Sequence, residues 1–429
     1  MKYYSLNKQS PIVDFKEATI RGQAPDKGLY FPERIPSIPA SFFENIDKLS
    51  DEEIAFQVIR PYVEGAIPDN ALQQIVAETI NFPLPLVPIT DDIYSLELYH
   101  GPTLAFKDVG ARFMSRCLGY FSKDRREKVT VLVATSGDTG GAVANGFYNV
   151  DGVEVVILYP SGKVSSVQEK QLTTLGGNIR ALEVEGSFDD CQKLVKQAFA
   201  DPELNKRLFL TSANSINVAR WLPQQFYYFF AYKQWKDKAN PPIICVPSGN
   251  FGNICAGILA HISGLPVNHF IAACNANQVV PRFLQTQQYT PAAAVPTISN
   301  AMDVGNPSNF VRILELFDNQ FLRLKKKLSS DSITDEETKK TIKDVFLKNN
   351  YLLDPHGAVG YAALEKYLKT SKTKGILLET AHPVKFYDVV EPVIDSKIPI
   401  PHSIQSLLDK NKRSTKIRNN YDDMVSALF

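Results

Sequence analysis

One lysine in this sequence stands where a side-chain amine could do covalent chemistry. In the stretch HGPTLAFKDVGARF, residues 100–113, Lys107 follows apolar residues and falls at the expected start of a helix. A lysine held in an apolar pocket has a lowered pKa, because burial disfavours the charged ammonium. The neutral amine could form a Schiff base and move protons. An ordinary surface lysine near a helix start is the alternative, and this stretch alone does not separate the two.

A second stretch, ATSGDTGGA at residues 134–142, follows the apolar run VTVLVAT and opens an expected helix. Its small residues would let the backbone approach a ligand. The free N–H groups at a helix N-terminus favour anions such as a carboxylate. A plain strand-to-helix turn with a Ser, Asp or Thr cap would have the same composition.

A third stretch, PSGNFGN at residues 247–253, lies between the run IICVPS and the expected helix ICAGILAHI. Glycines at a helix N-terminus form a cradle for a dianionic phosphate without requiring a lysine. The chain contains neither GxxxxGK[ST] nor GxGxxG, so neither a P-loop nor a dinucleotide fingerprint is present. A tight turn without a ligand is the alternative.

A hydroxyl completes the set. Thr380, in LETAHP, follows the apolar run GILLET. It could donate a hydrogen bond to a ring nitrogen, or simply cap the next helix. Together the four stretches place an amine, a carboxylate cradle, a phosphate cradle and a hydroxyl at strand–helix junctions. Pyridoxal 5′-phosphate (PLP), which carries an aldehyde, a phosphate and a pyridine nitrogen, matches that set.

The elements that would position these residues alternate between strand and helix from about residue 105 onward. Apolar, β-branched runs predict strands at residues 129–135, 153–159, 178–184, 207–212, 243–248, 269–274 and 375–380. Helical stretches such as VSSVQEKQLTTLG and SFDDCQKLVKQAFA lie between them. This alternation predicts parallel sheets covered by helices on both faces, with sites at the carboxyl ends of the strands.

Two other regions differ in pattern. The first 90 residues resemble a helical cap, because EEIAFQVIRPYVEG and DNALQQIVAETI carry apolar residues at three- and four-residue steps. The proline-bearing stretch NFPLPLVPIT then reads as a connector. The charged segment at residues 323–340 predicts a solvated helix start, with Thr334 and Glu337 forming a capping box.

Composition excludes several classes of protein. The 429 residues include 47 Lys and Arg against 46 Asp and Glu, a net charge of +1, which argues against nucleic acid or an anionic membrane as the main partner. No apolar run approaches the roughly 20 residues that span a bilayer. The start of the chain has no apolar segment typical of a secretory signal. Five widely spaced cysteines and six scattered histidines indicate neither a disulfide framework nor a metal site, and favour a reducing cytoplasm.

These motifs resemble the PLP enzymes of the tryptophan-synthase-β fold type and, within them, the threonine synthase family. The likeness runs over nearly the whole length and is closest to the shorter microbial branch that carries an N-terminal cap. It rests on the four stretches above together with YYSL, GLYFP, VQEKQ, NSIN and MDVGNPSN. It implies an α/β fold of type II, with two parallel-sheet lobes covered by helices and a mostly helical N-terminal cap. The implied boundaries are 1–95 for the cap, 96–109 plus 216–429 for the large cofactor-binding lobe, and 110–215 for the small lobe.

The resemblance also implies an activity: conversion of O-phospho-L-homoserine and water to L-threonine and phosphate, the last step of threonine biosynthesis. By it, Lys107 would hold PLP and move protons during catalysis, and Thr380 would face the pyridine nitrogen. Asp138 stands where many relatives have an Asn that contacts the 3′ oxygen of the cofactor. The residues expected around the cofactor phosphate are Ser248, Gly249, Asn250, Phe251, Gly252 and Asn253.

The substrate needs further contacts. Ser136, Gly137 and Thr139 are expected to hold its carboxylate. A leaving phosphate requires a second anion site, for which the candidates are Arg112, Lys163, Ser165, Ser215, Asn217 and Arg220. No metal is expected, and the protein is expected to act on a small molecule as a monomer or homodimer.

The sequence leaves three alternatives open. A serine or threonine dehydratase of the same fold needs only β-elimination and no site for a γ-phosphate. A related protein could bind PLP or a phosphate ligand without synthesis, although the retained Lys107 speaks against it. A nucleotide-binding module using GNFGN is disfavoured, since the P-loop lysine is missing.

Overall fold

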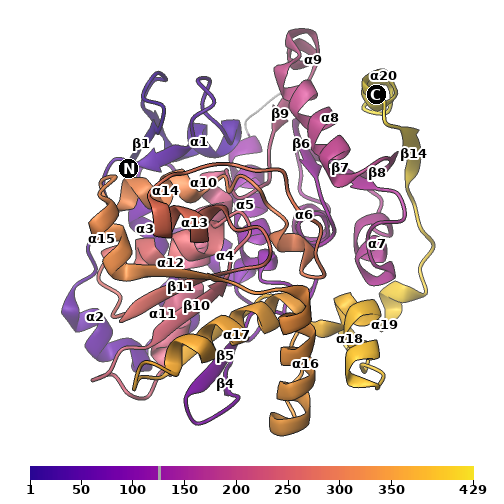
Figure 1. Cartoon of the computed structure of the whole chain (residues 1–429). Coiled ribbons are helices and arrows are strands. Elements are labelled where there is room, and N and C mark those ends of the chain that lie inside the picture. Colours follow the sequence, from indigo (N-terminus) through magenta and orange to yellow (C-terminus); the bar gives the residue numbers. More distant parts are fainter. Residues whose placement is uncertain (124–126) are drawn as a thin grey trace.

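Three sheets organise the chain in the computed structural model, which describes residues 1–123 and 127–429 (Figure 1). A six-stranded sheet has the order β12-β11-β10-β13-β5-β4, and a five-stranded sheet has the order β14-β8-β7-β6-β9. A smaller three-stranded sheet, β2-β1-β3, lies near the N-terminus. Within the described residues, no helix is both long and apolar enough to cross a membrane.

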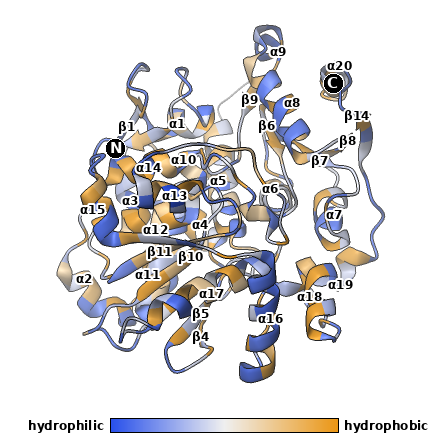
Figure 2. Ribbon diagram, viewed as in Figure 1, coloured by the Kyte–Doolittle hydropathy of each residue, from blue (hydrophilic) through white to orange (hydrophobic). Residues whose placement is uncertain are grey.

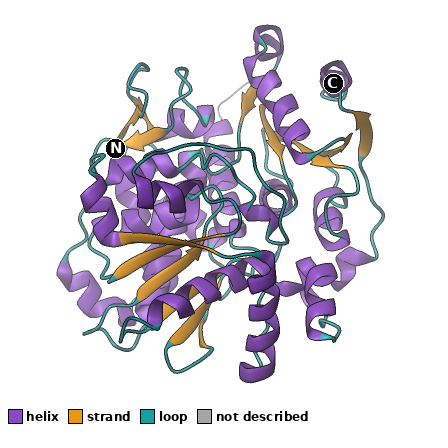
Figure 3. Ribbon diagram, in the orientation of Figure 1, coloured by secondary structure: helices purple, strands orange, loops and turns teal. Residues whose placement is uncertain are grey.

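The six-stranded sheet is parallel except for its edge strand β4 (Leu86–Pro88), which runs antiparallel to β5 (Ile93–Glu97). Its central strands, β10 (Ile243–Pro247) and β13 (Gly375–Glu379), are buried along their whole length. Continuous burial is typical of parallel strands covered on both faces. The covering helices, which include α12 (Gly252–Ile262) and α17 (Pro355–Leu368), lie on either side of the strands (Figure 3). The sheet is completed by β11 (His269–Cys274) and β12 (Leu328–Ser332).

The five-stranded sheet is parallel throughout. It contains β6 (Val129–Ala134), β7 (Val153–Pro160), β8 (Ile179–Glu185), β9 (Phe209–Thr211) and β14 (Thr415–Arg418). The intervening helices are α6 (Asp138–Phe147), α7 (Ser166–Thr173), α8 (Phe188–Ala200) and α9 (Pro202–Arg207). All seven strands predicted from apolar runs are therefore confirmed in the two parallel sheets.

The C-terminal segment lies differently from expectation. Residues 216–429 were expected in the large lobe, but β14 pairs with β8 at the edge of the five-stranded sheet. The final helix α20 (Tyr421–Ser426) packs against α8 of the same sheet. The chain crosses between the sheets through α18 (Tyr387–Ile394) and α19 (His402–Leu408). The sequence 410–420 is strongly basic and carries one buried apolar residue, Ile417, so its pattern gave no indication of a strand.

The N-terminal region combines helices with a small sheet. The predicted helices are present as α3 (Asp51–Val63) and α4 (Asp69–Thr79). Two shorter helices, α1 (Phe15–Arg21) and α2 (Ala40–Asn45), precede them. The antiparallel strands β1 (Lys2–Ser5), β2 (Val13–Asp14) and β3 (Tyr30–Pro32) were not predicted. Strands of two to four residues are too short to show an alternating pattern.

The charged segment at residues 323–340 contains more than a helix start. Thr334 and Glu337 do form the predicted capping box of α16 (Asp335–Asn349), and this helix is largely hydrophilic (Figure 2). The preceding residues form the end of α15 (Phe321–Lys327) and the edge strand β12. Leu328 is buried there, and β12 pairs with β11 alone, so its charged neighbours remain at the sheet edge.

Candidate active site

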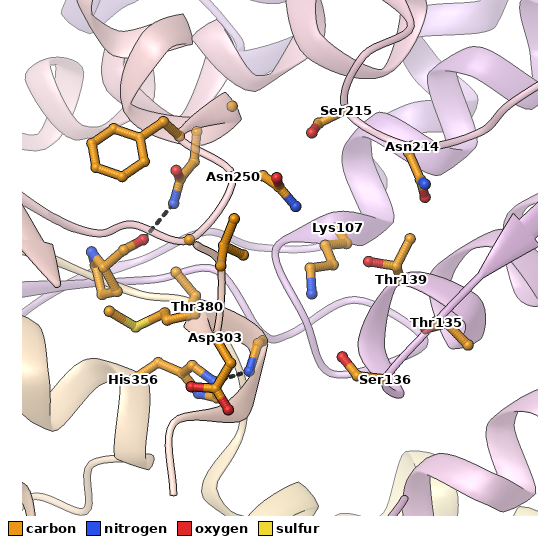
Figure 4. A pocket seen from close by; sticks show the side chains of 18 of the residues that line it. Lys107, Thr135, Ser136, Thr139, Asn214, Ser215, Asn250, Asp303, His356 and Thr380 are labelled. Carbon is orange, nitrogen blue, oxygen red and sulfur yellow. Dashed lines mark hydrogen bonds between the residues drawn. The ribbon is translucent and has the colours of Figure 1, made fainter. Parts of the chain in front are cut away.

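A pocket lies where the carboxyl ends of strands from both parallel sheets meet. Its lining includes Lys107, Thr139, Ser215, Asn250 and Thr380, which come from five separate segments (Figure 4). Ser136 and Thr139 follow β6, Asn250 follows β10 and Thr380 follows β13. This placement confirms that the predicted strand–helix junctions come together at one edge.

Lys107 is the first residue of α5 (Lys107–Ser122), and the preceding segment is tied to the end of β13. The Phe106 N–H donates to the Thr380 carbonyl oxygen at 2.9 Å, and Ala105 forms an antiparallel bridge with Ala381. Only 16% of the Lys107 side chain is exposed. Burial lowers the pKa of its amine from 10.5 to about 8, as the apolar setting of this lysine in the sequence predicted.

The charges around Lys107 act in opposite directions on that pKa. The carboxylate of Asp138 lies 3.8 Å from the Lys107 amine and raises the pKa, whereas Lys385 and Arg220 lower it. Asp138 is itself nearly inaccessible and accepts hydrogen bonds from Gln168 (3.0 Å) and Lys385 (2.7 Å). The two lysines hold the pKa of the Asp138 carboxyl well below its usual range despite the opposing effect of burial. Asp138 is therefore charged.

The loop after β10 has the shape of an anion cradle. Phe251 adopts a left-handed conformation (φ 60°), which turns the chain into α12 at Gly252. The first N–H groups of a helix have no partner within it, and those of α12 begin at the pocket. A Cβ atom added at Gly249 would lie 2.7 Å from the Ala301 carbonyl oxygen. Only glycine therefore fits between the pocket and the backbone at Ala301. The Ser248 hydroxyl instead donates to the Val246 carbonyl oxygen, and the Asn253 amide to that of Pro247.

A hydrogen-bond network holds this cradle against neighbouring loops. Asn309 donates to the Ser215 hydroxyl at 2.9 Å and to the Asn250 carbonyl oxygen at 3.1 Å. The buried guanidinium of Arg312 in turn donates to the Asn309 side chain and to the Ser215 carbonyl oxygen. The motifs NSIN, GNFGN and MDVGNPSN are thus one connected unit, with Ser215 and Asn250 facing the pocket.

Arg220 supplies a buried cation to the pocket. Its residue is 3% exposed, it lines the pocket, and neither its Nε nor its Nη1 has a hydrogen-bond partner within residues 1–123 and 127–429. Burial lowers the pKa of the guanidinium to about 10, so it stays charged at neutral pH. A buried charge without a partner is costly, which indicates that an anion belongs beside it.

Ser136, Thr139 and the N-terminus of α6 form another part of the wall. Gly137, at φ 138°, turns the chain into this helix, and a Cβ there would meet the Gln168 side chain at 2.4 Å. The N–H groups of Gly137 and Gly140 donate to the Thr135 hydroxyl. Those of Asp138 and Thr139 could bind a carboxylate, as the second stretch predicted.

Several candidates for the second anion site have other partners in this structure. Arg112 donates to the Glu78 carbonyl oxygen and to Asn81 in the N-terminal region. Asn217 caps α10 (Val218–Trp221) and donates to the Thr19 carbonyl oxygen. Ser165 caps α7, and Lys163 lies on the exposed loop after β7. Of the six candidates, Ser215 and Arg220 line the pocket, and the other four lie outside its lining.

The structure adds residues that the sequence patterns did not single out. His356 lines the pocket, accepts a hydrogen bond at Nε2 from the Ala301 N–H at 3.2 Å, and is paired through Nδ1 with Asp354. Glu379 is fully buried and accepts from the Asp354 N–H at 2.8 Å. Burial and the nearby Asp354 raise the pKa of Glu379 far above its usual value. Lys385 is fully buried two residues beyond LETAHP. The sequence clues were slight: Glu379 ends the apolar run of β13, Lys385 lies just beyond it, and His356 stands in the first turn of α17.

The residues fit PLP on grounds independent of any relative. A glycine cradle that a Cβ would fill stands beside an amine of lowered pKa, and an unpaired buried guanidinium faces the same pocket. The amine suits an aldehyde, and the cradle and the guanidinium each suit an anionic group of the bound molecules.

Comparison with known proteins agrees with this fit. Residues 81–378 match the family described as pyridoxal-phosphate dependent enzyme, residues 2–80 the threonine synthase N terminus, and residues 357–428 the threonine synthase C-terminal family. A threonine synthase of Haemophilus influenzae is 44% identical over 100% of this chain and 98% of its own. The chain belongs to the threonine synthase family.

Solved structures support the same assignment for the fold. A threonine synthase from Escherichia coli aligns with a TM-score of 0.93 at 41% identity, covering 100% of this chain and 99% of that chain. A PLP-bound threonine synthase from Brucella melitensis aligns with a TM-score of 0.93 at 35% identity, covering 100% and 98%. The predicted type II α/β fold is confirmed, and PLP is the cofactor of this family member.

Proposed function

We propose that this family member converts O-phospho-L-homoserine and water to L-threonine and phosphate, as a lyase that acts on a phosphate ester. The observation that carries this proposal is the unpaired Arg220 guanidinium in the same pocket as Lys107 and the glycine cradle. The cradle after β10 suits the phosphate of PLP. A substrate that brings its own phosphate requires another cation, and Arg220 is available for that role. A dehydratase acting on serine or threonine would have no use for it.

Bound PLP would supply an electron sink that stabilises negative charge on substrate carbon atoms. Lys107 is the residue we assign to its aldehyde. The same amine would take a proton from the substrate Cα and later return one. A pKa of about 8 suits both tasks, because a group that titrates near neutrality can serve as base and as acid.

The other residues would bind and orient the substrate. Ser136, Thr139 and the N-terminus of α6 would hold its carboxylate, which places the substrate amino acid across the pocket from the cradle. Arg220 and Ser215 would hold its phosphate, so that the bond at Cγ breaks with the leaving oxygen beside a cation. Gly249 to Asn253 would hold the cofactor phosphate, and Thr380 would face its ring nitrogen.

The test is to incubate the purified protein with PLP and O-phospho-L-homoserine and to identify the products. We expect threonine and phosphate in equal amounts. Serine or threonine giving mainly a 2-oxo acid, with no turnover of the phosphate ester, would favour the dehydratase. PLP binding with no turnover of either substrate would favour a non-synthetic member of the family.

The role of Lys107 is tested separately. Borohydride reduction followed by peptide mass analysis should place PLP on Lys107, and Lys107→Ala should lose both that adduct and threonine formation. Lys412→Ala is the matched control, since this lysine pairs with Glu169 and Glu183 away from the pocket lining. PLP attached to another lysine would overturn the assignment.

We also place the protein in the cytoplasm. Its five cysteines are free and buried in the structure, a state that suits a reducing compartment. Fractionation of the source cells with an antibody to the protein would test this placement.

A further inference from the structure

Lys385 is a fully buried lysine that has no role in the reaction proposed above. It lies in the short 3-10 turn Pro383–Phe386 after β13, and its residue exposure is 0%. Its amine lies 2.7 Å from Asp138 Oδ1 and donates to the Thr103 carbonyl oxygen at 2.7 Å. Burying an ammonium is costly even when it is paired, which raises the question of what the Lys385 charge does at this site.

The Asp138 carboxylate stands between two lysines. Its Oδ1 atom is bound by Lys385, whereas its Oδ2 atom faces the Lys107 amine at the longer distance of 3.8 Å. Since the attraction between charges falls with distance, Lys385 is the principal counter-ion of this carboxylate. The Lys107 nitrogen therefore faces a nearly neutral ion pair and not an isolated carboxylate.

Other charges face the same groups and complete the environment. Arg220 lowers the pKa of the Lys107 amine, whereas Asp354 raises it. The charge of Lys385 also acts to lower the pKa of Asp108 and of His382, although Lys385 forms no ion pair with either residue in the described structure. Asp108 is itself bound by the N–H and hydroxyl of Thr103, the residue whose carbonyl oxygen anchors Lys385.

We propose that Lys385 is a positioning residue that neutralises Asp138 and so lets the Lys107 nitrogen release its proton near neutral pH. This inference rests on the proposed role of Lys107 in holding PLP. An isolated carboxylate beside Lys107 would retain the proton, because an opposite charge within about 4–6 Å favours the charged form. For the free amine, burial lowers the pKa of Lys107, Asp138 raises it and Lys385 lowers it, so the two charges of the ion pair act with opposite signs on this nitrogen.

The experiment follows the absorbance of PLP on the full-length protein as a function of pH, which reports the proton on the Lys107 nitrogen without requiring turnover. Lys385→Met leaves Asp138 as an uncompensated negative charge, so the titration midpoint should rise by about one pH unit or more. Asp138→Asn leaves Lys385 as an uncompensated positive charge, and the midpoint should fall. The double variant carries neither charge and should titrate within about half a unit of the wild type. Lys412→Met, which removes a lysine from an ion pair away from the pocket lining, should not move it.

A midpoint that stays fixed or falls in Lys385→Met would overturn the inference. If a single variant does not fold, the double variant still decides, because a midpoint displaced by more than about one unit contradicts mutual neutralisation. Borohydride reduction of each sample separates the two proposals. PLP found on another lysine contradicts the role proposed for Lys107, whereas PLP on Lys107 with unchanged midpoints in both single variants contradicts this inference alone.

Discussion

The Phe106 N–H donates a 2.9 Å hydrogen bond to the carbonyl oxygen of Thr380. This bond joins the residue before Lys107 to the end of β13. The backbone segments that carry the Lys107 amine and the Thr380 hydroxyl are therefore fixed to each other directly. A loop attached only through side chains would not fix their separation as closely. The relationship makes Thr380 a suitable site for probing how the pocket holds the cofactor ring.

Thr380→Val should weaken PLP binding while leaving Lys107 able to react. The substitution keeps the side-chain shape and removes the hydroxyl, and the lost hydrogen bond is worth about 0.5–1.5 kcal/mol, or roughly 2- to 13-fold in Kd. Thr380→Ser retains the hydroxyl and should bind nearly as the wild type does. Equilibrium titration of the cofactor-free chain with PLP measures this. Equal affinities for Val and Ser would show that the hydroxyl makes no contact with the cofactor.

Gly249→Ala should damage the phosphate cradle. The added Cβ would lie 2.7 Å from a backbone carbonyl oxygen, which cannot rotate away as a side chain could. Overpacking of this kind costs about 1–3 kcal/mol, which corresponds to roughly 5- to 150-fold in the Kd for PLP. Gly119→Ala in α5, where the new Cβ meets a Val150 methyl at 3.0 Å, is the control and should leave the Kd unchanged. The prediction fails if both variants bind PLP equally well.

Arg220→Met should lower kcat/KM for O-phospho-L-homoserine. A hydrogen bond to a charged group is worth about 1.5–3 kcal/mol, so the loss should be roughly 13- to 150-fold. Inhibition by inorganic phosphate should weaken in parallel, because the same guanidinium would bind it. Arg60→Met, which removes an exposed partner of Asp69, should change neither value. Unchanged phosphate inhibition in Arg220→Met would place the second anion site elsewhere.

Glu379→Gln should alter how stability depends on pH. The folded pKa of Glu379 is raised above the ordinary 4.5, so its contribution to stability is complete below that value and is lost as the pH rises toward the folded pKa. Glutamine mimics the protonated acid and cannot ionise. The variant should therefore gain stability relative to the wild type between about pH 5 and about pH 7, by at most about 1.4 kcal/mol per unit.

Denaturant unfolding at the two pH values measures this difference. The exposed Glu203→Gln is the control and should change stability little at either pH. A relative stability of the variant that stays constant between these pH values would mean that Glu379 is already ionised in the folded protein.

The sequence by itself was enough to locate the main strands of both parallel sheets and three of the loops that meet at the pocket. Long β-branched apolar runs such as VTVLVAT are typical of buried parallel strands, and glycines directly after such a run are typical of a tight turn or a close approach of backbone. It also placed Lys107 correctly at a helix start in apolar surroundings. Local composition carries these features, so they need no knowledge of distant contacts.

Only the tertiary structure decided which charged groups share the pocket. Lys385 and Asp138 are far apart in the chain, and their pairing depends on how the end of β13 meets the start of α6. Arg112 and Arg220 looked equivalent as anion ligands, yet Arg112 binds the N-terminal region, while Arg220 lines the pocket with Lys107 and has no partner at Nε or Nη1 in the described part of the chain. The reason is physical: the cost of burying a charge, and hence its role, depends on neighbours that folding brings together from separate segments.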